Sequence, residues 1–375
     1  MTYLVAILGL AVLMIVHEAG HYFAARAFGL RVIKFSIGFG PTFFKIQPVE
    51  GFWTFVSLGD RVKVKLFKHD PERHGPTIFQ VAMIPFLAFV QIDGMNPLET
   101  PDPRDKGLYA NASIWGRIVT IFAGPAANYV FASVFFFFPF WIEGRDKVGE
   151  PTQIVTQDGA PAAVAGLKNA DTILSIDGTD VKSFEDISAK VQGAAEKPVA
   201  FVVLRDGEKV TIPIQAESAA CGPSNTDSKK VCIGVRPYTY KVPVSAAEAA
   251  KHAVVTPPVV VKSMLGGLAE WARGKSKEEL GGPTRMVHEM KKVADEGWAE
   301  FIFLLGALSA YLAAFNLLPI PALDGGRLMF LGYEAATRKR ANPTVEAHIH
   351  VIGLVMMLGL MLYVTFANDV PRFWK

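Results

Sequence analysis

Four long apolar stretches constrain the fold of this 375-residue chain more than any other feature of its sequence. They cover residues 3–28, 114–142, 298–320 and 349–367. Each approaches or exceeds the roughly 20 residues that a helix needs to cross about 30 Å of hydrocarbon. Only 19% of the residues are charged, below the roughly 25% of an average globular protein. The sequence therefore predicts a polytopic α-helical membrane protein with four transmembrane helices.

The basic residues predict how these helices are oriented. Lysine and arginine are frequent between the first and second stretches, and Arg327, Arg338, Lys339 and Arg340 lie between the third and fourth. Because positively charged loops tend to stay in the cytoplasm, we expect both loops there and the long middle segment outside. The net charge of +3 is too small to indicate a nucleic-acid partner. The expected partners are instead the lipid bilayer and membrane proteins.

The stretches also divide the chain into regions. We expect an N-terminal membrane core, an inserted domain, an amphipathic region and a C-terminal membrane core, at residues 1–147, 148–237, 238–297 and 298–375. Within the first core, we expect a cytoplasmic or re-entrant β region at residues 35–95, where residues 52–67 alternate in polarity like strands. The apolar segment around Pro85 is too short and broken to span a membrane. It is either a membrane-associated β-hairpin that re-enters the bilayer or a buried hairpin of a cytoplasmic loop.

Residues 148–237 have the pattern of a small domain built from strands and short helices. A helix of small residues leads to Gly166-Leu167, and Asp206-Gly207 is typical of a hairpin turn. This stretch resembles a PDZ domain of the bacterial, protease-associated kind. Cys221 and Cys232 flank a polar loop within it. A disulfide between them and two free thiols are both compatible with the sequence.

The strongest chemical signal lies inside the first apolar stretch, where the sequence reads His17-Glu18-Ala19-Gly20-His21. Residues four apart lie on one face of a helix, so both imidazoles can reach one metal ion, with Glu18 beside them to hold a water. Ionisable groups in the middle of a spanning helix cost roughly 2.5–3.5 kcal/mol each, so their presence needs a reason. The alternative is a polar cluster that binds neighbouring helices without a metal.

A third ligand can come from the end of the third stretch, where the sequence reads FNLLPIPALDGGRL. Pro319 and Pro321 should end the helix, and Gly325-Gly326 should let the backbone turn. Asp324 would then be presented from irregular backbone near membrane depth. Taken alone, Asp324 would be read as the N-cap of the next helix. Together with the first motif it predicts a His-His-Asp zinc site.

These motifs and the intervening PDZ-like domain resemble the site-2 protease family, peptidase family M50, and in particular its regulator-of-sigma-E protease type. The likeness covers nearly the whole chain and extends to three further segments, FSIGFG at 35–40, AGPAANYVFA at 123–132 and GGPTRM at 281–286. It implies that zinc is the cofactor and that His17, His21 and Asp324 bind it. It also implies that Glu18 is the general base that activates the zinc-bound water.

The resemblance implies further roles around this centre. Asn316 would hydrogen-bond the substrate backbone or the developing oxyanion. Asn128 would line the site, although an interhelical hydrogen bond is an equal alternative. The apolar hairpin around Pro85, with Phe86 and Phe89, would pair with an unwound substrate by strand addition.

The implied function is an intramembrane zinc metalloendopeptidase that cleaves single-pass transmembrane segments, for example those of anti-sigma factors or remnant signal peptides. It would lie in the bacterial inner, or cytoplasmic, membrane as a multi-pass protein with its PDZ domain on the periplasmic side. Two functions of other classes compete with it. An inactive PDZ scaffold would bind no zinc, and a metal transporter would take up metal into vesicles and usually shows repeated halves.

Overall fold

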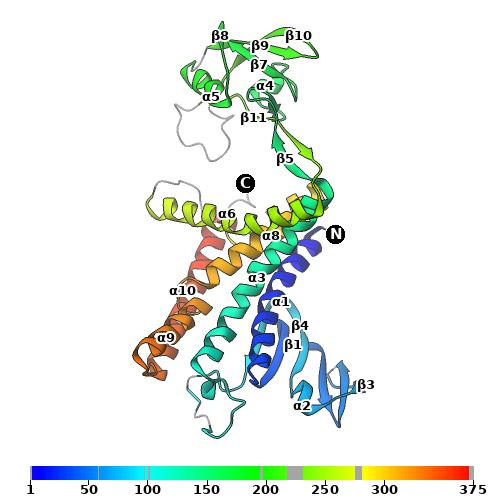
Figure 1. The fold of residues 1–375 in the computed structure, drawn as a ribbon, viewed down its shortest axis with the longest axis vertical. Helices are drawn as coiled ribbons and strands as arrows, with labels where there is room; N and C mark the ends of the chain where they lie inside the picture. The colour runs from blue at the N-terminus through cyan, green and yellow to red at the C-terminus, as the bar shows by residue number, and fades with distance from the viewer. Residues whose placement is uncertain are drawn as a thin grey trace. The chain divides into compact units, whose positions relative to one another are not determined.

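The computed structural model describes residues 2–57, 59–96, 98–99, 102–194, 197–217, 231–274 and 281–370. The chain forms two compact units (Figure 1). The first unit comprises Met1–Pro139, Ala247–Gly266 and Glu279–Lys375. The second comprises Phe140–Ala246 and Gly267–Glu278.

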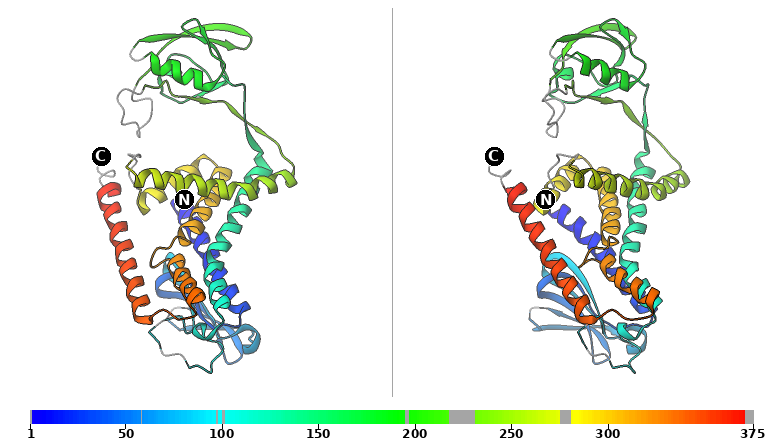
Figure 2. Two further views of the ribbon diagram at one scale, coloured as in Figure 1. Left: turned by 60° about the vertical axis from the view of Figure 1, so that its left-hand side comes forward. Right: turned by 90° about the vertical axis from the view of Figure 1, so that its left-hand side faces the viewer.

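Among the described residues, four helices are long and apolar enough to cross a membrane, as the sequence predicts. They are α1 (Thr2–Ala27), α3 (Ile114–Glu143), α8 (Trp298–Asn316) and α10 (Pro343–Val364). In both views of Figure 2, α10 lies at the side of the other helices, and most of its apolar residues are exposed. Within the first unit, this leaves an apolar helix surface of the kind that lipid covers.

Two of the predicted boundaries differ from the structure. The third stretch was expected to be helical to residue 320, but α8 ends at Asn316, because the backbone turns away before the two prolines. The fourth was expected to begin at residue 349, but α10 begins at Pro343. The Asn342 side chain accepts hydrogen bonds from the backbone N–H groups of Thr344 and Val345, so it caps this earlier start.

A four-stranded sheet occupies the segment in which β structure was expected. It contains β1 (Val32–Val49), β2 (Phe52–Ser57), β3 (Val62–Lys68) and β4 (Ile78–Ile92), in the order β3-β2-β1-β4. The short helix α2 (Pro71–His74) precedes β4. The sheet contacts α1 through β1 and β4, and Figure 1 shows these strands beside that helix.

Strand β4 folds back on itself. Lys34–Ile37 of β1 pair both with Ile78–Val81 and with Ala88–Gln91, so the two halves of β4 lie on opposite sides of this part of β1. Within the described strands, the half at 88–92 therefore forms an edge of the sheet. Its free side is available for other contacts.

The described part of the first unit contains further helices besides the four spans. They are η1 (Tyr109–Asn111), α7 (Pro283–Glu296), α9 (Asp324–Thr337) and part of α6 (Ala246–Ala272). Met290 of α7 is buried in a cluster with Leu13 of α1 and Leu305 of α8. The buried Asp369 accepts hydrogen bonds from the N–H groups of Gly282 and Arg285 at 3.0 and 3.2 Å and from the Thr284 hydroxyl. It therefore caps α7 from the end of the chain's last helix.

The second unit is built from short strands and two short helices. A sheet of order β10-β9-β7-β8 consists of β7 (Thr172–Ile176), β8 (Thr179–Asp180), β9 (Pro198–Arg205) and β10 (Glu208–Gln215). The strand pairs β6–β11 and β5–β12 comprise Ile154–Thr156 with Val235–Pro237 and Arg145–Val148 with Thr239–Val242. The helices that lie wholly within the described part of this unit are α4 (Pro161–Val164) and α5 (Phe184–Gly193).

Local sequence signals explain several of these elements. Asp206 and Gly207 both have positive φ and join β9 to β10 as the tight turn that the sequence predicts. Ser183 and Asp186 form a capping box at the start of α5. The likeness of this unit to a PDZ domain stays a prediction from the sequence. The sequence leaves open a disulfide between Cys221 and Cys232, and Cys221 lies outside the described residues.

A buried ion pair ties β9 to the segment before β7. The Arg205 guanidinium donates hydrogen bonds to both carboxylate oxygens of Asp171, at 2.8 and 2.6 Å, and the Lys168 N–H donates another at 2.8 Å. Asp171 is only 2% exposed. Burial acts to raise the pKa of Asp171, but these donors hold it below its ordinary value of 3.8.

We expect Asp171→Asn to destabilise the second unit by about 2 kcal/mol or more, because the Arg205 charge would lose its partner. Since the pKa of Asp171 is depressed in the folded state, the pair contributes fully above pH 3.8 and its contribution is lost as the pH falls below that value. Hydrogen exchange of the β7 and β9 amides in the full-length chain measures the loss. The exposed Asp180 lies on the same sheet, and an equal loss in Asp180→Asn would contradict the prediction.

Candidate metal centre

Helix α1 and the first residue of α9 bring three candidate ligands together. His17 and His21 lie one turn apart in α1, and Asp324 begins α9. The Asp324 Oδ2 atom lies 3.1 Å from His17 Nε2 and 3.3 Å from His21 Nε2. The two Nε2 atoms are 3.2 Å apart. These three residues are the only cluster of metal-binding side chains found in the described part of the chain.

The spacing of these atoms fits a tetrahedral zinc ion. Zinc lies about 2.0–2.2 Å from nitrogen and carboxylate oxygen ligands, so two of its ligands are about 3.3 Å apart. All three measured distances agree with that edge length. Both imidazoles are buried, and Asp324 Oδ2 is buried without a hydrogen-bond donor among the described residues. Two neutral imidazoles and one carboxylate are a donor set that leaves a fourth position open.

The loop between α8 and α9 presents Asp324. Residues 317–323 are irregular, and Ala322 has a φ of 74°. Leu323 is the N-cap of α9, and no side chain caps this end, so Asp324 is not the cap that the sequence alone would favour. Gly325 and Gly326 were expected to let the backbone turn. They are instead helical, and a Cβ at Gly325 would lie 2.0 Å from the Leu318 carbonyl oxygen, so glycine is needed there for close packing.

A second set of contacts orients the imidazoles. His21 Nδ1 lies 2.8 Å from the Thr120 carbonyl oxygen of α3, a contact that places the ring proton on Nδ1 and leaves Nε2 for the metal. His17 Nδ1 lies 3.3 Å from Asn128 Nδ2. Asn128 is fully buried in α3, and its main-chain carbonyl accepts a 2.8 Å hydrogen bond from the Ser309 hydroxyl of α8.

Two glycines allow α1 and α3 to approach closely enough for these contacts. A Cβ at Gly20 would lie 2.2 Å from the Ala123 carbonyl oxygen, and one at Gly124 would lie 2.3 Å from His21 Nε2. No side chain larger than hydrogen fits at either position without displacing backbone or a ligand. The Gly of the H-E-x-x-H motif is therefore a packing residue.

Glu18 faces the edge half of β4. Its Oε2 accepts a 3.0 Å hydrogen bond from the Val90 N–H. A pocket of about 490 Å³ opens beside it, with walls that include the three candidate ligands, Glu18, Asn316 and Phe89. A carboxylate in this position can accept a proton from a water held at the centre.

The other predicted site residues take different places. Asn316 ends α8 and lines the same pocket, but its Nδ2 donates a 3.0 Å hydrogen bond to the Leu312 carbonyl. Phe89 is 38% exposed and lines the pocket from β4. Asn128 lies behind His17 rather than on the pocket wall. Phe86 belongs to β4, but its side chain lies outside what the structure describes.

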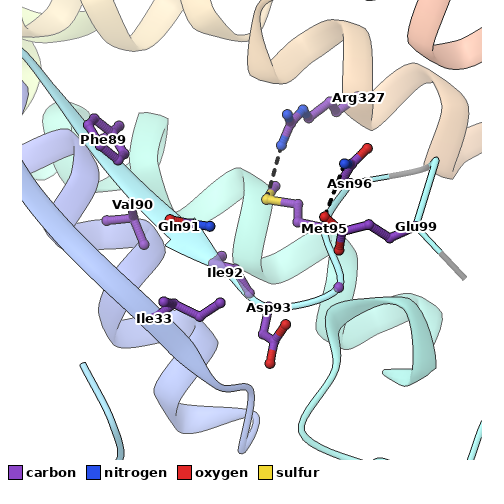
Figure 3. A pocket seen from close by; sticks show the side chains of 11 residues that line it. Ile33, Phe89, Val90, Gln91, Ile92, Asp93, Met95, Asn96, Glu99 and Arg327 are labelled. Carbon is purple, nitrogen blue, oxygen red and sulfur yellow. Dashed lines mark hydrogen bonds between the residues drawn. The ribbon is translucent and has the colours of Figure 1, made fainter. Parts of the chain in front are cut away.

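The sequence did not single out Arg327 or Met95 as functional residues. Both line the metal pocket and an adjoining pocket of about 650 Å³, which Figure 3 shows from close by. The spacing of Arg327, three residues after Asp324, could have indicated a shared helix face. Met95 follows the strand and carries no such signal.

Comparison with known proteins decides the family. The model of peptidase family M50 matches residues 5–65 and 52–360. This chain belongs to peptidase family M50. It is 33% identical over 382 residues, with 96% of each chain covered, to "Putative zinc metalloprotease mll0638" of Mesorhizobium japonicum. It is 29% identical to "Putative zinc metalloprotease R01501" of Rhizobium meliloti, covering 96% of this chain and 94% of the relative. It is 28% identical to "Probable protease eep" of Enterococcus faecalis, covering 100% and 99%.

The chain is thus a zinc metalloprotease of the site-2 protease family and a membrane protein. Zinc, when bound by three protein ligands, makes a water acidic enough to supply hydroxide near neutral pH. The residues of this chain suited to hold zinc are His17, His21 and Asp324, and Glu18 is placed to take the proton.

We expect Gly124→Ala to lose zinc as completely as His21→Ala does. The added methyl group would occupy the position of the His21 ring, whereas alanine itself favours a helix. Gly332→Ala in α9 is the matched control, because a methyl group added there would have no other atom within 4 Å beyond its own stretch of helix. Elemental analysis of each purified chain measures zinc, with about one ion expected for the wild type and Gly332→Ala. Full zinc in Gly124→Ala would show that the ligands lie elsewhere.

Proposed function

We propose that this zinc metalloprotease cleaves membrane-spanning segments of other membrane proteins within the bilayer. The single observation that carries the proposal is the depth of the metal centre. At 1.5 Å per residue, His17 lies about 22 Å from the start of α1 and His21 about 9 Å from its end. Both positions fall inside a span that is long enough for about 30 Å of hydrocarbon.

The surroundings of the centre suit an extended chain segment. The edge half of β4 lines the pocket with Phe89, Val90 and Ile92. An edge strand can pair with an unwound substrate through main-chain hydrogen bonds, which demands little of the substrate sequence. A substrate helix must unwind before its amide bonds become accessible, so helix-breaking residues near the cut would favour cleavage. Asn316, which also lines this pocket, would turn its amide to the substrate backbone or the oxyanion.

The substrates and the cellular location are proposed from the resemblance to the site-2 protease family. Single-pass segments, such as those of anti-sigma factors or remnant signal peptides, are the proposed substrates. The protein would lie in a bacterial inner membrane, with the PDZ-like unit on the periplasmic side, where it would control access. The basic loops between the first and second spans and between the third and fourth support this orientation.

We expect Glu18→Gln to reduce cleavage of a single-pass substrate in liposomes by at least about 100-fold, the usual contribution of a general base. Zinc content should be unchanged, because Glu18 is not one of the three ligands. Mass spectrometry of the products locates the cut, which we expect within the hydrophobic segment.

Glu289→Gln is the matched control, because Glu289 is exposed on α7. Activity of Glu18→Gln equal to that control would exclude Glu18 as the base. Cuts confined to the soluble flanks of the substrate would leave a zinc protease but exclude intramembrane cleavage.

A further inference from the structure

Arg327 is a half-buried cation with a poor hydrogen-bond partner. Its Nη1 donates to the Met95 sulfur at 3.1 Å, as Figure 3 shows, and a thioether is only a weak acceptor. In the described part of the chain, no carboxylate lies within ion-pairing distance of this guanidinium. An arginine has five N–H donors, so most of its hydrogen-bonding capacity remains for a ligand or for water.

The position of Arg327 relates it to the metal centre. It follows Asp324 by three residues in α9, so the two side chains share a helix face. Arg327 and Met95 line the metal pocket, the pocket beside β4 and a third pocket of about 400 Å³ between α9 and α10. Arg327 thus lies where the three pockets adjoin.

The proposed hydrolysis produces a carboxylate anion at the metal centre. The peptide C–N bond breaks, the water oxygen joins the carbonyl carbon, and the acyl half leaves as a carboxylate while the other half takes up a proton as an amine. The new carboxylate appears in the pocket that Arg327 shares with the three candidate ligands and Glu18. A guanidinium binds a carboxylate through two parallel hydrogen bonds.

We propose that Arg327 binds the new C-terminal carboxylate of the acyl product and draws it from the metal centre into the pocket of about 650 Å³ beside β4. This inference rests on the proposed function, and it makes Arg327 a product-binding residue. An anionic lipid headgroup is the other source of a charged oxygen for this guanidinium.

The test measures binding of two labelled peptides of alanine and leucine, identical except that one ends in a carboxylate and the other in an amide. Fluorescence anisotropy follows their binding to the zinc-loaded full-length chain in neutral phosphatidylcholine vesicles. We expect the carboxylate form to bind the wild type about 10-fold or more tightly than the amide. Arg327→Gln should remove this preference, and Arg327→Lys should keep part of it. Arg338→Gln, at the exposed end of α9, should behave as wild type.

Three outcomes would overturn the proposal. Equal binding of the peptides to the wild type would show that the pocket does not select a carboxylate, and a preference that survives in Arg327→Gln would place the carboxylate on the metal. In vesicles with added phosphatidylglycerol, loss of the wild-type preference would assign Arg327 to lipid. Because binding requires no cleavage, failure of the intramembrane protease assay is a separate result.

Asn128 supports a second inference from an independent observation. Its Nδ2 faces His17 Nδ1 at 3.3 Å, while its Oδ1 is buried without a partner among the described residues. If His17 binds zinc through Nε2, its Nδ1 carries a proton and needs an acceptor. Exchanging the amide oxygen and nitrogen, which look alike in shape, gives His17 Nδ1 an acceptor and Asn128 Oδ1 a donor.

We infer that Asn128 accepts the Nδ1 proton of His17 through Oδ1 and so positions this ligand. The Thr120 carbonyl does the same for His21. Orienting partners of this kind change metal affinity about 10- to 100-fold. Asn128 would then act behind the centre and would not touch substrate.

Zinc affinity, measured by competition with a chelator, tests this role without an activity assay. We expect Asn128→Leu to weaken zinc binding about 10- to 100-fold, and Asn128→Asp to retain it because a carboxylate also accepts the proton. Ser309→Ala removes only the contact with the main-chain carbonyl of Asn128 and should retain zinc affinity. Equal losses in Asn128→Asp and Asn128→Leu would reduce Asn128 to a packing residue, as would a wild-type affinity in Asn128→Leu.

Discussion

The close contact between α1 and α3 is the constraint on which the metal centre depends. Gly20 and Gly124 leave no room for a side chain between the two helices, and small residues of this kind let helix backbones approach in a membrane. Only at this distance can the His21 ring reach the Thr120 carbonyl and the His17 ring reach Asn128. The helix pairing and the ligand geometry are therefore one structural feature, and a change that separates the helices disorders the ligands.

Hydrolysis requires water in a part of the protein that is otherwise apolar. The structure concentrates non-helical backbone where that water is needed, in the edge half of β4 and in the loop before Asp324. Non-helical backbone is tolerated at membrane depth when it lines a cavity or is buried in protein. Both segments line the pocket that holds Glu18 and the ligands, and the Val90 N–H of the β4 edge donates a hydrogen bond to Glu18.

Local patterns predicted a large part of this arrangement. Apolar length predicted the four helices, and the four-residue spacing of His17 and His21 follows from the helical period. Asn342 before Pro343 is a helix-start signal that could have corrected the start of α10. The doubling of β4, the Asp369 cap of α7 and the exposure of Arg327 to three pockets could not be predicted. Each depends on residues that are far apart in sequence, and no periodicity records such contacts.

The position of α9 illustrates how a distant contact completes the site. Arg117, at the start of α3, donates hydrogen bonds at 2.9 and 2.6 Å to the two carboxylate oxygens of Glu334, and it holds the pKa of Glu334 below its ordinary value. Glu334 lies in the same helix as Asp324. A bidentate pair of this kind fixes orientation as well as distance. Helix α3 thus binds α9, which carries Asp324. It also orients the imidazoles of α1 through Thr120 and Asn128, so one helix positions all three ligands.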